Sequence, residues 1–87
     1  MLFRSMNAAV TATTSNTFSP FSVDILVGGA VMFTFDKLHN VTFGGGSAPA
    51  NIENTSSGTV ARTFNAAGTF DYVCTIHPGM SGVVVVR

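Results

Sequence analysis

Apolar and polar residues alternate along most of this chain with the two-residue period that is typical of half-buried β-strands. The clearest run has one histidine in phase with its apolar positions, and these positions are Val31, Phe33, Phe35, His39, Val41 and Phe43. Side chains two residues apart lie on the same face of a strand. The run therefore predicts two strands whose inward face includes His39.

The other expected strands are shorter, and turn residues separate them. They cover residues 6–14, 22–27, 59–64, 69–73 and 83–86, and a further short strand is expected near Ile52 within a loop over 44–57. Gly28-Gly29 is typical of a turn between hairpin partners, and the valine-rich 83–86 run is typical of a strand that is covered on both faces. The pattern predicts an all-β fold, a Greek-key sandwich of seven to eight strands.

Phe70, Tyr72 and Cys74 share the parity of the expected inward face of the strand over 69–73. Phe70 and Tyr72 are expected to form an apolar shell that excludes water, together with Phe33, Phe35, Phe43 and Val83. Because a buried hydroxyl without a partner is costly, we expect the Tyr72 hydroxyl to be hydrogen-bonded.

Composition limits the function classes. The chain has 87 residues, of which 46% are hydrophobic and 9% charged, so a single globular domain over 1–87 is expected, with 1–5 as a disordered or artificially added N-terminus. The formal net charge is zero, which argues against nucleic acid as a partner. No apolar run approaches the length of a membrane span.

Candidate chemistry gathers in the loop expected between the last two strands, Cys74-Thr75-Ile76-His77-Pro78-Gly79-Met80. It contains the chain's one cysteine, so an internal disulfide is excluded. A thiolate, two neutral imidazoles and a weak axial thioether are the ligands of a blue-copper site. The second imidazole can come only from His39, so we predict one copper per chain, bound by His39, Cys74, His77 and Met80.

These residues carry a family resemblance that covers nearly the whole chain. The matching segments are Phe18-Ser-Pro, Val27-Gly-Gly-Ala-Val-Met-Phe-Thr-Phe, His39-Asn-Val-Thr-Phe, Ala67-Gly-Thr-Phe-Asp-Tyr-Val-Cys and Cys74 to Gly82. The chain resembles the cupredoxins of the plastocyanin, azurin and amicyanin group. The two-residue gaps on either side of His77 are similar to the compact ligand loop of amicyanins. The resemblance implies that His39, Cys74 and His77 are equatorial ligands and that Met80 is the axial one.

The resemblance also implies roles around the metal. Asn40 would tie the two ligand loops together by hydrogen bonds, although an ordinary turn or edge asparagine is an equally good interpretation. Pro78 and Gly79 restrict the path of the loop. An electron would leave through His77, in a patch with Ile76, Pro78 and Gly79, to transient redox partners of a monomer.

Location is implied by the family alone. Cupredoxins usually work in the periplasm or outside the cell, so a periplasmic or extracellular location is expected. The N-terminus lacks the apolar stretch of a signal peptide, so the chain is either a mature or trimmed form or a cytosolic protein, and the resemblance favours the trimmed form.

Other functions were weighed against the blue-copper electron carrier. A Cys–His pair can serve as nucleophile and base, but no third residue or oxyanion-hole motif accompanies Cys74 and His77, so an enzyme is not expected. A copper-trafficking protein with the same ligands, a zinc-bound form and a structural sandwich without metal remain open alternatives.

Overall fold

The computed structural model describes residues 6–87, and the expectation for residues 1–5 lies outside this range. Within the described range the chain is built from strands and contains no helix, which confirms the expected all-β sandwich. The strands are β1 (Ala8–Ala12), β2 (Phe18–Ser19), β3 (Ser22–Ile25), β4 (Ala30–Phe35), β5 (His39–Phe43), β6 (Ile52–Thr55), β7 (Thr59–Thr63), β8 (Gly68–Val73) and β9 (Ser81–Val86).

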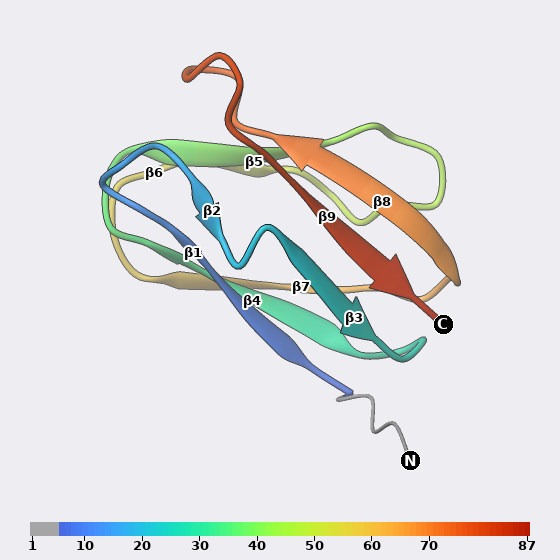
Figure 1. The fold of residues 1–87 in the computed structure, drawn as a ribbon. Coiled ribbons are helices and arrows are strands. Elements are labelled where there is room, and N and C mark those ends of the chain that lie inside the picture. The colour runs from blue at the N-terminus through green and yellow to red at the C-terminus, as the bar shows by residue number, and fades with distance from the viewer. Residues whose placement is uncertain (1–5) are drawn as a thin grey trace.

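The strands form two sheets that face each other (Figure 1). One sheet has the order β2-β1-β4-β7 and the other the order β3-β9-β8-β5-β6. Both are mixed, because β1 pairs with β4 and β3 pairs with β9 in parallel, while the other pairs are antiparallel. The loop between β8 and β9 projects at the upper left of Figure 1, and the C-terminus lies at the opposite end.

The core between the sheets follows the predicted parity. The alternating positions of β4 and β5 are all buried, namely Val31, Phe33, Phe35, His39, Val41 and Phe43. Tyr72 lies at the centre of an aromatic cluster, with its ring centroid 4.7 Å from that of Phe18 and 5.4 Å from that of Phe33 in edge-to-face contacts. The apolar alternation therefore fixes which face of each strand meets the other sheet.

Three expectations about the strands and their connections need correction. Gly28-Gly29 forms a turn, with Gly28 at φ 89°, but it joins β3 in one sheet to β4 in the other, so the flanking strands are not hairpin partners. Val27, assigned to the strand before it, lies outside β3 and is 43% exposed. Strand β2 was not expected, because Ser19-Pro20 is typical of a turn that interrupts strand structure. Only two residues of β2 pair with β1.

Strand β9 is covered less completely than its valine run predicts. Val84 and Val86 are buried, whereas Val83 and Val85 are half-buried. The strand lies inside its sheet, between β3 and β8, so its edges are paired, while its outer face has no layer of the described chain over it. The unbroken valine run therefore reflects a central strand and not a strand buried on both faces.

The Tyr72 hydroxyl has no hydrogen-bond partner among the described residues, contrary to expectation. Burial raises the pKa of Tyr72 above its ordinary value of 10.0. The phenol lies against β9 at Gly82, where an added Cβ would come within 2.5 Å of the ring carbon Cζ. The absence of a side chain at Gly82 thus makes room for the ring and hydroxyl of Tyr72.

Candidate metal centre

Strand β5 and the β8–β9 loop bring together three of the predicted ligands. One donor atom from each of His39, Cys74 and His77 lies within 4.8 Å of the other two. The two imidazole Nδ1 atoms are 3.1 Å apart, and Cys74 Sγ lies 3.9 Å from His39 Nδ1 and 3.5 Å from His77 Nδ1. His39 thus meets Cys74 and His77, which lie more than 30 positions later in the sequence.

The orientation of His39 is fixed by a backbone carbonyl that lies directly after β1. Its Nε2 lies 2.7 Å from the carbonyl oxygen of Thr13. A carbonyl only accepts, so Nε2 carries the proton and donates it. The neutral ring then has its lone pair on Nδ1, the nitrogen that faces Cys74 and His77. The fully buried His39 is therefore held in the tautomer that a metal ligand requires.

Cys74 is buried, and its sulfur accepts the backbone N–H of Asn40 at 3.4 Å. The side chain of Asn40 then joins the two ligand segments. Its amide nitrogen donates to Thr75 Oγ1 at 2.8 Å, and its carbonyl oxygen accepts the Thr75 backbone N–H at 3.0 Å. Asn40, a residue of β5, thus joins its strand to the ligand loop, as the family resemblance implies.

The ligand loop closes on itself through backbone hydrogen bonds. Cys74 N–H donates to the Met80 carbonyl at 3.0 Å, and Met80 N–H donates to the His77 carbonyl at 3.1 Å. Gly79 has φ 85°, a left-handed conformation that favours glycine. Pro78 precedes it and fixes its own φ. The short loop therefore holds Cys74, His77 and Met80 in one compact turn.

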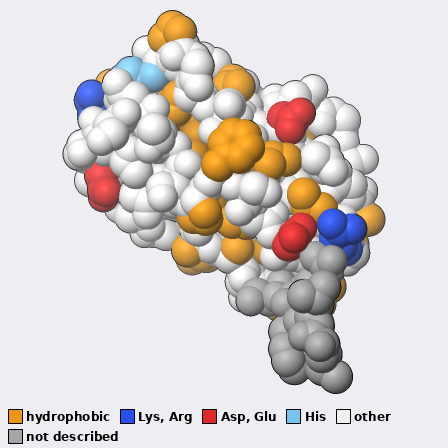
Figure 2. Space-filling model, viewed as in Figure 1, with side chains coloured by type: hydrophobic (Ala, Val, Ile, Leu, Met, Phe, Trp, Pro, Cys, Tyr) orange, Lys and Arg blue, Asp and Glu red, His pale blue; other side chains and the backbone are white. Residues whose placement is uncertain are grey.

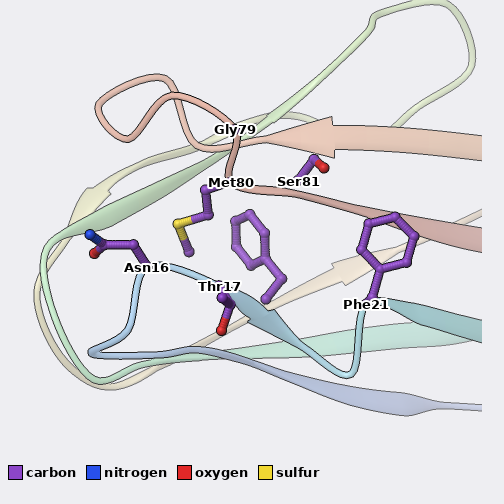
Figure 3. Close-up of a pocket in the computed structure, with 7 residues that line it drawn as sticks. Asn16, Thr17, Phe21, Gly79, Met80 and Ser81 are labelled. Carbon is purple, nitrogen blue, oxygen red and sulfur yellow. The ribbon is translucent and has the colours of Figure 1, made fainter.

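Met80 is buried at the base of this loop. Figure 3 shows its side chain pointing away from the loop toward the segment that precedes β2. There it lines a cavity of about 250 Å³ together with Phe18, Phe21 and other residues. The thioether is thus the innermost part of the Met80 side chain and lies between the loop and the opposite sheet.

His77 lies at the surface end of the centre. It is half-buried, and the neighbouring Ile76 is 40% exposed. Partial desolvation lowers the pKa of His77, and electrostatic interactions with the neighbouring His39 and Lys37 lower it further. Each effect favours the neutral imidazole, the form that binds metal. Figure 2 shows a histidine exposed at the same end as the loop, beside a cationic side chain and close to hydrophobic ones.

The donor set fits a copper ion. Metal–nitrogen and metal–sulfur bonds of about 2.0 and 2.3 Å are typical of imidazole and thiolate ligands, and three donors 3.1–3.9 Å apart can share one ion at such lengths. A soft thiolate with two imidazoles suits copper or zinc and does not suit magnesium or calcium.

One contributor to the centre was missed by sequence reasoning, namely the Thr13 carbonyl that orients His39. Every residue has a carbonyl, so nothing in the residue type of Thr13 indicates this role. A second missed residue is Asn54, whose side-chain oxygen accepts a 3.0 Å bond from Asn40. The small polar run 53–57 gave only the general signal of a surface connection.

Comparison with known proteins agrees with this geometry. A model of the copper-binding proteins of the plastocyanin/azurin family matches residues 5–87. Amicyanin-alpha from Methylorubrum extorquens is 41% identical over 76 residues, which cover 80% of this chain and 64% of the relative. The chain thus spans less than two thirds of that relative's length.

The fold is also similar to those of copper proteins whose structures have been solved. Amicyanin from Paracoccus versutus superposes with a TM-score of 0.78 at 31% identity, over 92% of this chain and 80% of that one. A copper-containing nitrite reductase from Thermus scotoductus SA-01 superposes with a TM-score of 0.77 at 26% identity, over 100% of this chain and 23% of the enzyme. Fold, donor set and family match agree: the chain belongs to the plastocyanin/azurin family of copper-binding proteins, and its cofactor is copper.

Proposed function

We propose that the protein is a one-electron carrier with a type 1 (blue) copper centre. His39, Cys74 and His77 would be the equatorial ligands, and Met80 would be the weak axial ligand. The observation that carries the proposal is the convergence of the two Nδ1 atoms and Cys74 Sγ, with 3.1 Å between the nitrogens. Copper in such a site supplies one-electron chemistry by alternating between Cu(I) and Cu(II).

The residues around the ligands support this use because they hold the donors nearly fixed. His39 is buried within a strand and hydrogen-bonded at its far nitrogen. The loop that carries Cys74 is closed by two backbone bonds and joined to β5 through Asn40. A site that needs little rearrangement suits both oxidation states, which favours electron transfer.

We further propose that electrons leave through His77 to transient protein partners. The surrounding surface is apolar or small, with Ile76 exposed by 40% and Pro78 and Gly79 also exposed. Short-lived redox complexes use small interfaces, and a small, largely apolar patch at one tip suits brief docking of a monomer. Among the described residues there is no helix long and apolar enough to cross a membrane. The family favours a periplasmic or extracellular location.

We propose that the protein itself is not an enzyme. The nitrite reductase to which it is similar is a much longer chain, of which this fold covers 23%. Both histidines of the present sequence already belong to the proposed copper centre. A second copper centre built on imidazoles would lack its ligands, so the carrier role fits the sequence better than catalysis.

Titration of the apoprotein with Cu(II), followed by visible absorption, tests the proposal. We expect an intense blue charge-transfer band that saturates at one copper per chain. Cys74→Ser, which replaces the sulfur and keeps the shape of the side chain, should abolish the band and leave the fold intact by circular dichroism. A folded wild-type protein without the band would contradict the proposal. Rapid loss of Cu(I) to a chelator would instead indicate copper trafficking.

A further inference from the structure

The turn between β1 and β2, residues 13–17, contacts the copper centre although it provides no ligand. We infer that this turn is a positioning element for His39 and that it is held in shape by the Thr13 hydroxyl and by Lys37. The inference rests on the proposed copper site. It concerns side chains that have no direct contact with the ligand atoms of Cys74 and His77.

The contact with His39 is made by the Thr13 carbonyl oxygen. This atom accepts the His39 Nε2–H at 2.7 Å and also the Asn16 backbone N–H at 3.2 Å. Its position decides which way the imidazole plane faces, because the rest of the His39 ring is buried in the core. A shift of this carbonyl would rotate the ring or break the hydrogen bond of Nε2–H, and the lone pair of Nδ1 would no longer point toward Cys74.

The Thr13 side chain closes the turn that holds this carbonyl. Thr13 Oγ1 accepts the backbone N–H groups of Ser15 at 3.2 Å and Thr17 at 3.3 Å, and it bonds to Thr17 Oγ1 at 2.8 Å. The Thr13 N–H also donates to the Thr17 carbonyl at 2.9 Å. One hydroxyl therefore organises a turn that otherwise contains small polar residues and Asn16 in a left-handed conformation, φ 60°.

A second contact fastens the turn to the histidine's own segment. Lys37, two residues before His39, donates from Nζ to Asn16 Oδ1 at 3.1 Å. The turn and the start of β5 are thus connected twice, through Lys37–Asn16 on the outside and through Thr13–His39 on the inside. Two connections restrict both the distance between the segments and the twist between them, which a single hydrogen bond would leave free.

The matched pair Thr13→Val and Thr34→Val tests this inference. Both substitutions keep a β-branched side chain and remove a hydroxyl that bonds to another threonine, since Thr34 Oγ1 lies 2.9 Å from Thr59 Oγ1 where β4 pairs with β7. The first readout is the ¹⁵N NMR spectrum of the imidazoles in metal-free protein. It reports the His39 tautomer, which a general loss of stability would not change while the protein stays folded.

We expect wild type and Thr34→Val to show His39 with the proton on Nε2 and Thr13→Val to show a mixture of tautomers. The affinity for Zn²⁺, used as a redox-inactive probe, should fall about 10- to 100-fold in Thr13→Val alone. Unchanged tautomer and affinity in folded Thr13→Val would overturn the inference. If Thr13→Val does not fold, Thr17→Val removes the partner hydroxyl and decides in the same way.

Failure of the copper proposal would be recognised separately. The tautomer is measured without metal, so it tests the positioning role even if wild type forms no blue centre. Lys37→Arg and Lys37→Met complete the test, because we expect Arg, which can still donate to Asn16, to keep the wild-type tautomer and Met, which cannot, to show a mixture of tautomers. A wild-type spectrum for Lys37→Met would remove the outer connection from the inference.

Discussion

At the scale of single residues, the core contains one polar atom that its surroundings do not satisfy. The Tyr72 hydroxyl is buried without a partner among residues 6–87, while its ring makes edge-to-face contacts with three phenylalanines, Phe18, Phe33 and Phe43. The ring therefore stabilises the sandwich and the hydroxyl opposes that stabilisation. The two parts of this side chain can be separated by one substitution.

Tyr72→Phe should make the protein more stable. Removal of an unsatisfied buried hydroxyl recovers its desolvation cost, which is about 1–3 kcal/mol, less the contacts that the oxygen makes with Gly82. We expect a net gain of about 1 kcal/mol in the free energy of unfolding of the apoprotein, measured with urea. A loss of similar size would show that an ordered water satisfies the hydroxyl.

The difference between wild type and Tyr72→Phe should grow at alkaline pH. Burial raises the pKa of Tyr72 in the folded protein, whereas the unfolded chain ionises near 10.0. Above that pH the unfolded state binds fewer protons than the folded state, so wild-type stability falls as the pH rises. Urea titrations at pH 8 and pH 11 check this, and a constant difference between the two proteins would contradict it.

Gly82 and Gly44 allow a matched test of the close packing around Tyr72. A Cβ at Gly82 would clash with the phenol ring, whereas a Cβ at Gly44 would have no described atom within 4 Å. Gly82→Ala should therefore lower the free energy of unfolding by about 1–3 kcal/mol, and Gly44→Ala should leave it nearly unchanged. Equal effects in urea unfolding would show that the phenol ring can move aside without cost.

At the scale of elements, Asn40 connects strand β5 to the ligand loop and to β6. Its side chain makes hydrogen bonds to Thr75, Asn54 and Thr42. Asn40→Ala removes all of these and leaves the Thr75 N–H without its acceptor. We expect the free energy of unfolding to fall by about 2–3 kcal/mol and the copper affinity, measured by competition with a chelator, to fall about 10- to 100-fold.

Asn7→Ala is the control for Asn40→Ala. The Asn7 side chain accepts the Ala30 N–H at 2.9 Å, at the beginning of β4 and outside the copper centre. Its loss should lower stability and leave copper affinity unchanged. If both variants lose copper equally, the effect of Asn40 comes from general stability and not from its connection of the ligand segments.

Some properties of the strands could be predicted from the sequence and others could not. Side-chain parity is local, so the inward faces of β4 and β5 and the burial of His39 could be predicted from alternation alone. Strand pairing is not local. The parallel contacts of β1 with β4 and of β3 with β9 give no signal in the residues, and the turn at Gly28-Gly29 was therefore interpreted as a hairpin although it crosses between sheets.

In the candidate site, too, some contributors could be predicted from the sequence and others could not. Ligand chemistry belongs to side chains, so His39, Cys74, His77 and Met80 could be named as candidate ligands from residue types and spacing, and the structure brings the first three together. The Thr13 carbonyl belongs to the backbone, which is the same at every position, so only the fold reveals that it orients His39. The unpartnered Tyr72 hydroxyl is a similar case, because parity predicts burial but not what the hydroxyl meets.

At the scale of the whole molecule, charge and shape together favour docking at one tip. The formal net charge is zero, so two copies, or a copy and a partner, have little long-range attraction or repulsion. The exposed histidine, the apolar Ile76 and the ligand loop lie at the same end of the sandwich (Figures 1 and 2). Contact through this tip brings the metal centres of two molecules close together, whereas contact through the sheet faces does not.

Electron self-exchange between oxidised and reduced copies, measured by NMR line broadening, tests this tip. Wild type should show a rate that changes little with ionic strength.

Ile76→Glu and Met32→Glu add the same charge at side chains that are each 40% exposed, one in the ligand loop and one on β4 in the opposite sheet. A carboxylate at the tip faces its copy directly in the encounter, so Ile76→Glu should exchange about tenfold more slowly at low salt and recover as salt screens the charges. Met32→Glu should keep the wild-type rate. Equal slowing in both variants would mean that net charge, and not the tip, controls the encounter, and an unchanged rate in Ile76→Glu would place the exchange surface elsewhere on the molecule.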